Sequence, residues 1–235
     1  MTATGTVDTS HEELRKKLLE INVWAMTLIL ALVLERSSGA IVFIAGARRH
    51  VDATVWWAVF LMALVFGILL ATTVGILVLH VRFRAPYSYW YVVVDNVFVT
   101  VPLYFAVRFI AASIGFGETS PTGGTSTTLR LDASLFRVGV ALIALSYVFL
   151  FVRDLMVLPE IRDRLSVVPL VAVGSMHVLG ALLFLLTAIA PDFVGYVAAI
   201  GSIGLGFFFA GMAAIPLIER RFAVAKLSKE ARASG

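Results

Sequence analysis

The stretch LALVLERSSGAIVFIAG, residues 30–46, decides what kind of fold this chain adopts. It is apolar at both ends, and its middle carries Glu35 and Arg36, followed by two serines and a glycine. As a helix, residues 21–34 alone would rise only about 21 Å, which is less than the roughly 30 Å of a bilayer's hydrocarbon core. Either one long helix therefore carries both charges, or two half-segments meet at Ser37-Ser38-Gly39.

The composition of the whole chain favours a bilayer as its solvent. Of 235 residues, 60% are hydrophobic and 14% are charged, whereas soluble domains carry about 25% charged residues. A single soluble domain of this length cannot hide so much apolar surface. The net charge is +4, but the basic residues lie between apolar runs. The lipid bilayer, rather than nucleic acid, is therefore the expected partner, and we expect an integral protein of the cell (plasma) membrane.

Six apolar runs are long enough to span a bilayer. They lie at about 20–46, 53–82, 87–113, 133–157, 167–190 and 193–218. The runs are continuous rather than alternating, which favours helices over strands. Ser10-His11-Glu12-Glu13 has the form of a capping box, and Asp52 and Asp132 stand where helix N-caps would stand. The sequence therefore predicts an all-α polytopic bundle of six transmembrane helices.

The lysines and arginines predict the orientation of the bundle. With a cytoplasmic N-terminus, 13 of the 19 basic residues lie on the cytoplasmic side. These are Arg15, Lys16, Lys17, Arg82, Arg84, Arg153, Arg162, Arg164, Arg220, Arg221, Lys226, Lys229 and Arg232. We therefore expect both termini in the cytoplasm. A segment at 1–19 with a short amphipathic helix would precede the membrane domain, 20–218, and a basic tail, 219–235, would follow it. The Gly-, Ser- and Thr-rich loop 113–132 faces outward and is interpreted as a mobile tether rather than a lid.

The charges inside the spans are the candidate site. Each costs about 2.5–3.5 kcal/mol on insertion scales, and neighbouring side chains on a helix point about 100° apart. At least one of Glu35 and Arg36 therefore needs a partner on another helix or a path of water. By depth, Glu35, Arg36, Asp95 and His177 would share one central layer, with Asn96 and Thr100 beside it.

Other polar residues suggest how such a layer would open to either side. Ser88, Tyr91 and Asp95 form a stripe on the inner half of the third span, which would line the bundle interior. Arg108 and Arg137 lie near the outer ends of adjacent spans. They form either a cationic outer mouth or two side chains that snorkel to the interface.

The stretch YWYVVVDNVFVTVPL, residues 89–103, resembles the third helix of microbial rhodopsins. The Tyr-Trp pair, the Asp five residues after the Trp, and Phe-x-Thr-x-Pro-Leu share its spacing. The resemblance implies that Asp95 stands where that family has the Schiff-base counter-ion. Retinal, however, needs a lysine in the last helix of that family. The lysines here, Lys16, Lys17, Lys226 and Lys229, lie outside the predicted spans, so we expect no cofactor.

The sequence leaves several classes of function open. The leading one is a channel or small transporter for protons or small ions. In it Asp95 is the ligand, Glu35 a second carboxylate, Arg36 a charge partner, His177 a relay, and Asn96 and Tyr91 line the path. The alternative is a non-transporting scaffold or sensor subunit. It would associate, as a homo-oligomer or with other proteins, through the glycines of the last run, Gly201, Gly204, Gly206 and Gly211.

A membrane enzyme comes third, because we find no catalytic motif and no metal-ligand spacing. Access of water to the polar layer distinguishes a channel or transporter from a scaffold. A water-accessible cavity reaching Asp95 and Glu35 favours transport, whereas a dry, fully paired layer favours the scaffold.

Overall fold

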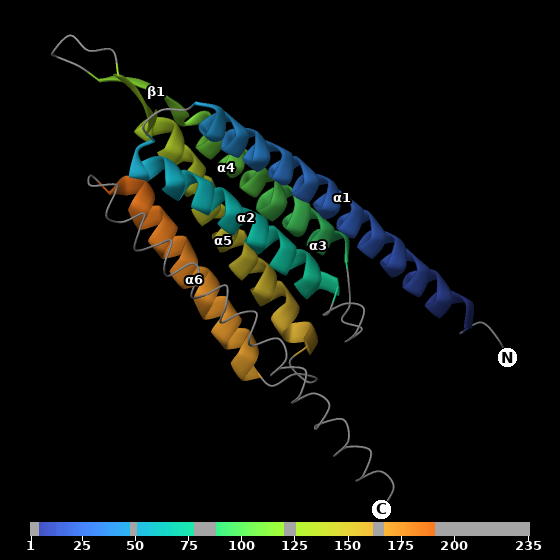
Figure 1. Ribbon diagram of the computed structural model, residues 1–235. Helices are drawn as coiled ribbons and strands as arrows, with labels where there is room; N and C mark the ends of the chain where they lie inside the picture. The colour runs from blue at the N-terminus through green and yellow to red at the C-terminus, as the bar shows by residue number, and fades with distance from the viewer. Residues whose placement is uncertain (1–4, 48–50, 78–87, 120–125, 162–166, 191–235) are drawn as a thin grey trace, which may run out of the picture.

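A computed structural model describes residues 5–47, 51–77, 88–119, 126–161 and 167–190. Figure 1 shows an elongated bundle of helices. They are α1 (Gly5–Gly46), α2 (Ala53–Leu77), α5 (Ala133–Ile161), α6 (Val167–Ile189) and a composite third span. The third span consists of α3 (Tyr89–Val93), the π-helix η2 (Val94–Thr100) and α4 (Val101–Ala112).

Four of these segments are long and apolar enough to cross a membrane, namely Glu12–Gly46, Ala53–Leu77, Tyr89–Ala112 and Ala133–Met156. The helices coincide with the first five predicted runs. The sixth run, its glycines Gly201, Gly204, Gly206 and Gly211, and the basic tail lie outside the described residues. The cytoplasmic location of both termini stays a prediction.

The opening stretch forms part of one continuous helix, which decides between the two alternatives for Glu35 and Arg36. The serines that follow do not break α1. The hydroxyl of Ser37 donates to the carbonyl of Val33 at 2.8 Å, and that of Ser38 donates to the carbonyl of Leu34 at 2.7 Å. Serine hydroxyls bonded back to the preceding turn leave no unsatisfied group in an apolar setting. The helix therefore passes through the polar stretch without interruption.

The N-caps predicted at Asp52 and Asp132 are confirmed. The capping box predicted at Ser10 is wrong, because α1 begins at Gly5 and Ser10 lies inside it. The Asp52 carboxylate accepts a hydrogen bond from the backbone N–H of Thr54 at 2.9 Å. The Asp132 carboxylate accepts one from the N–H of Ser134 at 2.8 Å and a longer one from Leu135 at 3.3 Å. Each aspartate thereby satisfies N–H groups that a helix start leaves without intrahelical partners.

The Asp132 cap predicts a pH-dependent contribution to stability. Hydrogen bonds from the hydroxyl and the N–H of Ser134, and from the N–H of Leu135, lower the pKa of Asp132 because they favour its charged form. A group whose pKa is lower in the folded state stabilises the fold above its unfolded pKa, and this stabilisation is lost as the pH falls through the folded pKa. We expect the melting temperatures of wild type and Asp132→Ala to differ most above about pH 5 and to converge as the pH falls well below the ordinary aspartate pKa of about 4. A difference that stays constant from neutral pH down to about pH 2 would contradict this origin.

Residues 114–119 and 126–131 form strands, which corrects the expectation of a mobile tether for these residues and is the exception to an all-α fold. Strands β1 (Ile114–Thr119) and β2 (Ser126–Leu131) pair antiparallel, with Ile114 opposite Leu131. Leu129 is fully buried, and its carbonyl accepts a hydrogen bond from the N–H of Asp52 at 3.1 Å. The ring of Phe116 packs edge-on against Phe43 of α1 at 5.5 Å. These contacts anchor the loop to the ends of α1 and α2.

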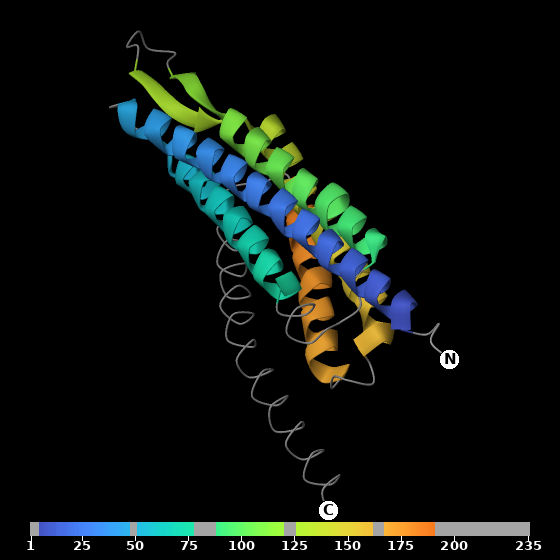
Figure 2. The same ribbon diagram turned by 90° about the vertical axis from the view of Figure 1, so that its right-hand side faces the viewer.

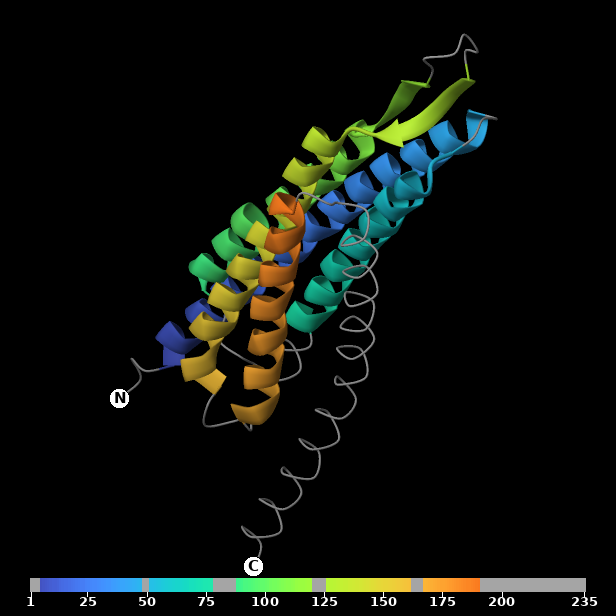
Figure 3. The same ribbon diagram turned by 90° about the vertical axis from the view of Figure 1, so that its left-hand side faces the viewer.

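The interior of the bundle is mostly apolar, and close helix contacts set its shape. Figure 2 shows α1 crossing one face between α2 and the third span, and Figure 3 shows α6 on the opposite side beside α5. At Gly139 of α5, an added Cβ would lie 2.7 Å from Cγ1 of Ile110 and 2.9 Å from the carbonyl oxygen of Ala106. The absence of a side chain there lets α4 and α5 approach each other closely.

Candidate functional site

Three helices bring a buried polar cluster together around Asp95. This aspartate lies in η2 and is fully buried. Its Oδ1 lies 2.5 Å from Nε of Arg153 on α5, and its Oδ2 accepts a hydrogen bond from the Asn22 amide on α1 at 3.2 Å. The Arg153 side chain is itself 10% exposed. The chain therefore holds a charge pair in its interior, with an amide from a third helix beside it.

The π-helix explains how the cluster is positioned. In η2 the Thr100 hydroxyl donates to the backbone carbonyl of Asp95, five residues before it. The Asn96 amide donates to the Val92 carbonyl at 2.9 Å and also to Oδ1 of Asn22. A π-helix makes such wider turns and is frequently found at functional sites. Here the carboxylate of Asp95 contacts both Arg153 of α5 and Asn22 of α1, and the amide of Asn96 contacts Asn22 as well.

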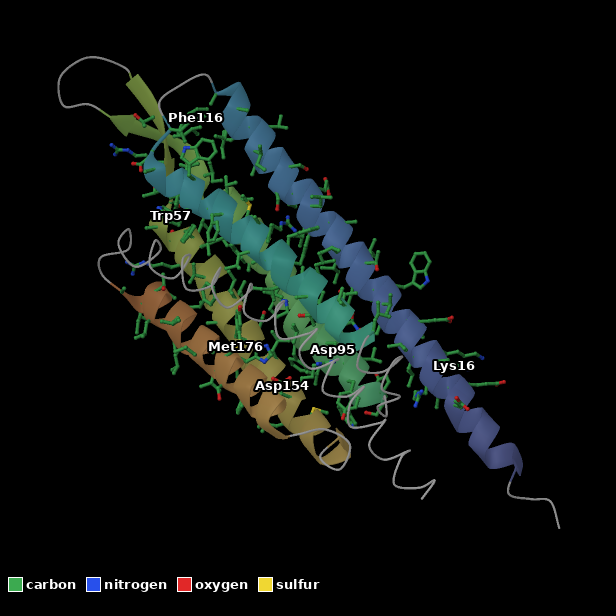
Figure 4. All side chains as sticks on the ribbon, turned by 60° about the horizontal axis from the view of Figure 1, so that its bottom comes forward. Lys16, Trp57, Asp95, Phe116, Asp154 and Met176 are labelled. Atoms are coloured by element: carbon green, nitrogen blue, oxygen red, sulfur yellow. The ribbon has the colours of Figure 1, made fainter. Side chains whose placement is uncertain are left out.

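A histidine–carboxylate contact lies next to this ion pair along α5. Nδ1 of His177 on α6 lies 2.6 Å from Oδ2 of Asp154. Both side chains are largely buried, and the ring of Tyr147 lies 6.0 Å from that of His177. Because Arg153 and Asp154 are consecutive, they point to different sides of α5 and meet different helices. Figure 4 shows Asp95 and Asp154 toward one end of the bundle and Phe116 toward the other.

We call Asn22, Asp95, Asn96, Arg153, Asp154 and His177 the inner polar layer. Asp95 lies six positions after the start of α3, and Arg153 lies eight positions before the end of α5. These offsets correspond to about 9 Å and about 12 Å. The layer therefore lies nearer to one end of these helices, the end predicted to be cytoplasmic.

Glu35 and Arg36 do not belong to this layer, which corrects the prediction. Asn22 occupies the level of Asp95, and Glu35 follows Asn22 by thirteen positions in α1, or about 20 Å along the axis. Both charged side chains are exposed. Within the described ranges neither forms a salt bridge, so the predicted interhelical partner is not seen there. The error arose because the depth of Glu35 was counted from a presumed membrane boundary at residue 20, whereas α1 begins at Gly5.

The two other arginines lie at the level of Glu35. Arg108 follows Asp95 by thirteen positions and is exposed. Arg137 precedes Arg153 by sixteen positions, and its Nη2 donates to the carbonyl of Ala190 at 2.8 Å. A cation is favourable at that place because the carbonyls at the end of α6 carry partial negative charge. Arg137 therefore joins α5 to the end of α6, which is a packing role that the outer-mouth prediction did not include.

An apolar band lies between the inner polar layer and the level of Glu35, Arg108 and Arg137. Its fully buried side chains include Val99, Leu103, Ala106, Val107, Ile110, Phe136, Val140 and Ile143. The buried hydroxyl of Ser146 donates to the carbonyls of Leu142 and Val99. In the part of the chain that the structure describes, no buried side chain in this band is charged. The inner polar layer is therefore separated from Arg108 and Arg137 by about 20 Å of mostly apolar packed side chains.

Tyr91 lies on the side of the inner polar layer that faces away from the apolar band. Its ring is buried, and its hydroxyl donates to the carbonyl of Met156 at 3.1 Å. Ser88, the first member of the predicted stripe, is exposed. The stripe thus runs from the surface into the bundle as predicted, but the Tyr91 hydroxyl is occupied by a backbone carbonyl of α5.

Two side-chain atoms of the layer show what it can do chemically. Nη2 of Arg153 and Oδ1 of Asn96 are buried and have no hydrogen-bond partner among the described residues. A buried donor and acceptor of this kind are usually satisfied by water, which the adjacent end of the bundle can supply. No group of three metal-ligating side chains occurs in the same residues. The layer is thus suited to hold ion pairs and water.

Sequence reasoning missed Asn22, Arg153 and Asp154. Arg153 was assigned to the cytoplasmic side because it stands near the end of an apolar run, and no role was predicted for Asp154. Asn22 was overlooked although it is polar and stands two residues inside a predicted span. These three residues could have been found by counting positions from the predicted cytoplasmic end of each span, because this count places them at about the same depth as Asp95.

Comparison with protein-family models, with curated proteins and with solved structures finds no match to this chain.

Proposed function

We propose that this chain is a non-transporting integral membrane protein, a scaffold or sensor subunit. Its inner polar layer would hold α1, the third span, α5 and α6 in one register. Other proteins would bind its exposed helix faces, among which the sequence suggests the glycine-rich run 193–218. The observation that carries the proposal is the full burial of Asp95 in a cluster supplied by three helices.

The apolar band supports this proposal over transport. A proton or ion that passes through the bundle needs polar groups or water along its path. Between the inner polar layer and Arg137, the buried side chains of η2, α4 and α5 are hydrophobic, apart from the hydroxyl-bearing Thr100 and Ser146. Oxygen atoms in the band, such as that of Ser146, already bond to backbone carbonyls. This arrangement suits a protein that keeps a fixed shape.

A specific observation favours transport of protons or small ions as the second candidate. Four ionisable side chains lie inside a mostly apolar bundle, as the ion pair of Asp95 with Arg153 and the hydrogen-bonded contact of Asp154 with His177. A buried ion pair is often no more stabilising than apolar side chains of the same volume. Ionisable groups inside a membrane therefore commonly mark proton or ion pathways. In this candidate Asp95 is the ion or proton ligand and His177 the relay.

One flux experiment separates the two candidates. The purified protein is reconstituted into liposomes that carry a pH or cation gradient, and proton and cation fluxes are recorded between pH 5 and 8. We expect no flux above that of protein-free liposomes, because the apolar band blocks the path. A proton ionophore added at the end of each run shows that the vesicles are sealed and the dye responds.

Two variants identify the groups responsible if flux appears. Asp95→Asn keeps the shape of the side chain and removes its charge, and His177→Gln removes the titratable imidazole that contacts Asp154. A wild-type flux that Asp95→Asn abolishes, in protein that still elutes as a folded species, would overturn the scaffold proposal and establish transport through Asp95. A flux lost only in His177→Gln would assign the pathway to the second pair.

A further inference from the structure

Helix α1 is the least covered of the span-length helices. In its most apolar stretch 11% of the residues are buried, against 39–44% in the other three. Met26, Val33 and Ile44 pack inward. The opposite side has no covering element among the described residues, and Figure 2 shows it facing outward along the whole helix. This side of α1 also carries charged side chains, at Glu35 and Arg36, which a surface that contacts only lipid does not need.

The outward stripe of α1 consists of Leu28, Leu32, Glu35, Gly39, Val42 and Gly46. Its members are spaced alternately by four and three residues, which is the spacing of a helix–helix seam. Leu28 is 63% exposed and Val42 is 69% exposed. An added Cβ at Gly39 or Gly46 would meet nothing within 4 Å. The two glycines leave room for another helix backbone to approach.

Glu35 breaks the apolar character of the stripe. Asn22 contacts Asp95, so Glu35, thirteen residues after Asn22, lies level with residue 108 of α4. Because α4 ends at Ala112, Glu35 lies about one helical turn before that end. Apolar residues flank it on both sides, and the next residue is Arg36. Neither side chain has an ion pair within the described ranges. Since both charges are costly in lipid, a surface that neutralises them has an advantage over lipid.

We propose that the outward stripe of α1 is the contact between two copies of this chain. Copies inserted in the same orientation place their α1 helices parallel. A two-fold axis along the stripe then sets each Glu35 at the depth of the partner's Arg36, so that two reciprocal ion pairs form. Gly39, one turn further on, permits the close approach that these pairs need. The inference goes beyond the proposed function and does not depend on whether the chain transports anything.

Cysteine cross-linking tests the contact directly, because the chain has no native cysteine. Gly39→Cys puts a thiol on the stripe. Leu34→Cys is the matched control, because Leu34 is on the same helix, is 55% exposed and points away from the stripe. In membranes under mild oxidation, we expect disulfide-linked dimers of Gly39→Cys and at least about tenfold less dimer from Leu34→Cys. Equal cross-linking of both would overturn the proposal, since it would reflect random collision.

A charge exchange tests the ion pairs. In the Gly39→Cys background, Glu35→Arg places like charges opposite each other, and we expect the dimer fraction to fall at least about tenfold. Adding Arg36→Glu exchanges the two charges, restores both reciprocal pairs and should recover the dimer. Failure of the exchanged variant to recover, in protein that inserts and folds like wild type, would overturn the pairing.

The same cross-linking assay also shows whether the last predicted span, rather than a second copy of the chain, covers the stripe. If Gly39→Cys gives no dimer but forms an intramolecular disulfide when combined with Gly204→Cys, the last predicted span covers α1 and the proposal is wrong. Subunit counting in lipid nanodiscs or by photobleaching provides an independent readout. A wild-type protein that is monomeric at all protein-to-lipid ratios would also overturn it.

Discussion

Replacing Arg153 with leucine will destabilise the protein by about 3–5 kcal/mol, the usual cost of breaking one side of a buried ion pair. Asp95 is fully buried, and Nε of Arg153 lies 2.5 Å from its Oδ1. Without the guanidinium, the carboxylate remains charged in an apolar interior. The loss will be smaller if the carboxyl takes up a proton. Unfolding by denaturant in mixed micelles measures the difference in free energy.

The double variant Arg153→Leu/Asp95→Asn provides the control. It removes both charges and keeps an amide that can bond to Asn22, so we expect it to be more stable than Arg153→Leu alone. A double variant damaged as much as the sum of the two single variants would show that the residues do not compensate each other. In that case the inner polar layer would contribute to stability through packing rather than charge.

Replacing Gly139 with alanine will have the second largest effect. The new Cβ would lie 2.7 Å from Cγ1 of Ile110 and 2.9 Å from the carbonyl oxygen of Ala106. Because one of these atoms belongs to the backbone, α4 and α5 must separate. We expect a loss of about 1–3 kcal/mol, as for other overpacked cores. The same unfolding assay measures it.

Gly75→Ala is the matched control for this substitution. Gly75 lies inside α2, and an added Cβ there meets nothing within 4 Å. Alanine is the better helix former by about 1 kcal/mol, so this variant should be as stable as wild type or more stable. Equal destabilisation by both substitutions would mean that the α4–α5 contact at Gly139 is not as close as described.

The lengths of the apolar runs and the capping residues at their ends were sufficient to predict most elements of the fold. The five described helices lie where apolar runs of about 20 residues predict them, because such runs are what a bilayer's thickness requires. Asp52 and Asp132 cap helices as predicted, since their hydrogen bonds are local. The hairpin at 114–131 was not predicted, because its strands are stabilised by contacts with α1 and α2 and not by their own Gly-, Ser- and Thr-rich sequence.

The sequence by itself determined that charged residues lie within apolar helices and that Asp95 is prominent among them, because composition and spacing within one run are local properties. Only the tertiary structure decided the partners. Asp95 pairs with Arg153 rather than lying level with Glu35, His177 pairs with Asp154, and Asn22 joins the cluster. The physical reason is register. The level at which two helices meet depends on where each one begins and on close contacts such as Gly139 with Ile110. A shift of one turn moves a side chain by about 5.4 Å, more than the length of an ion pair.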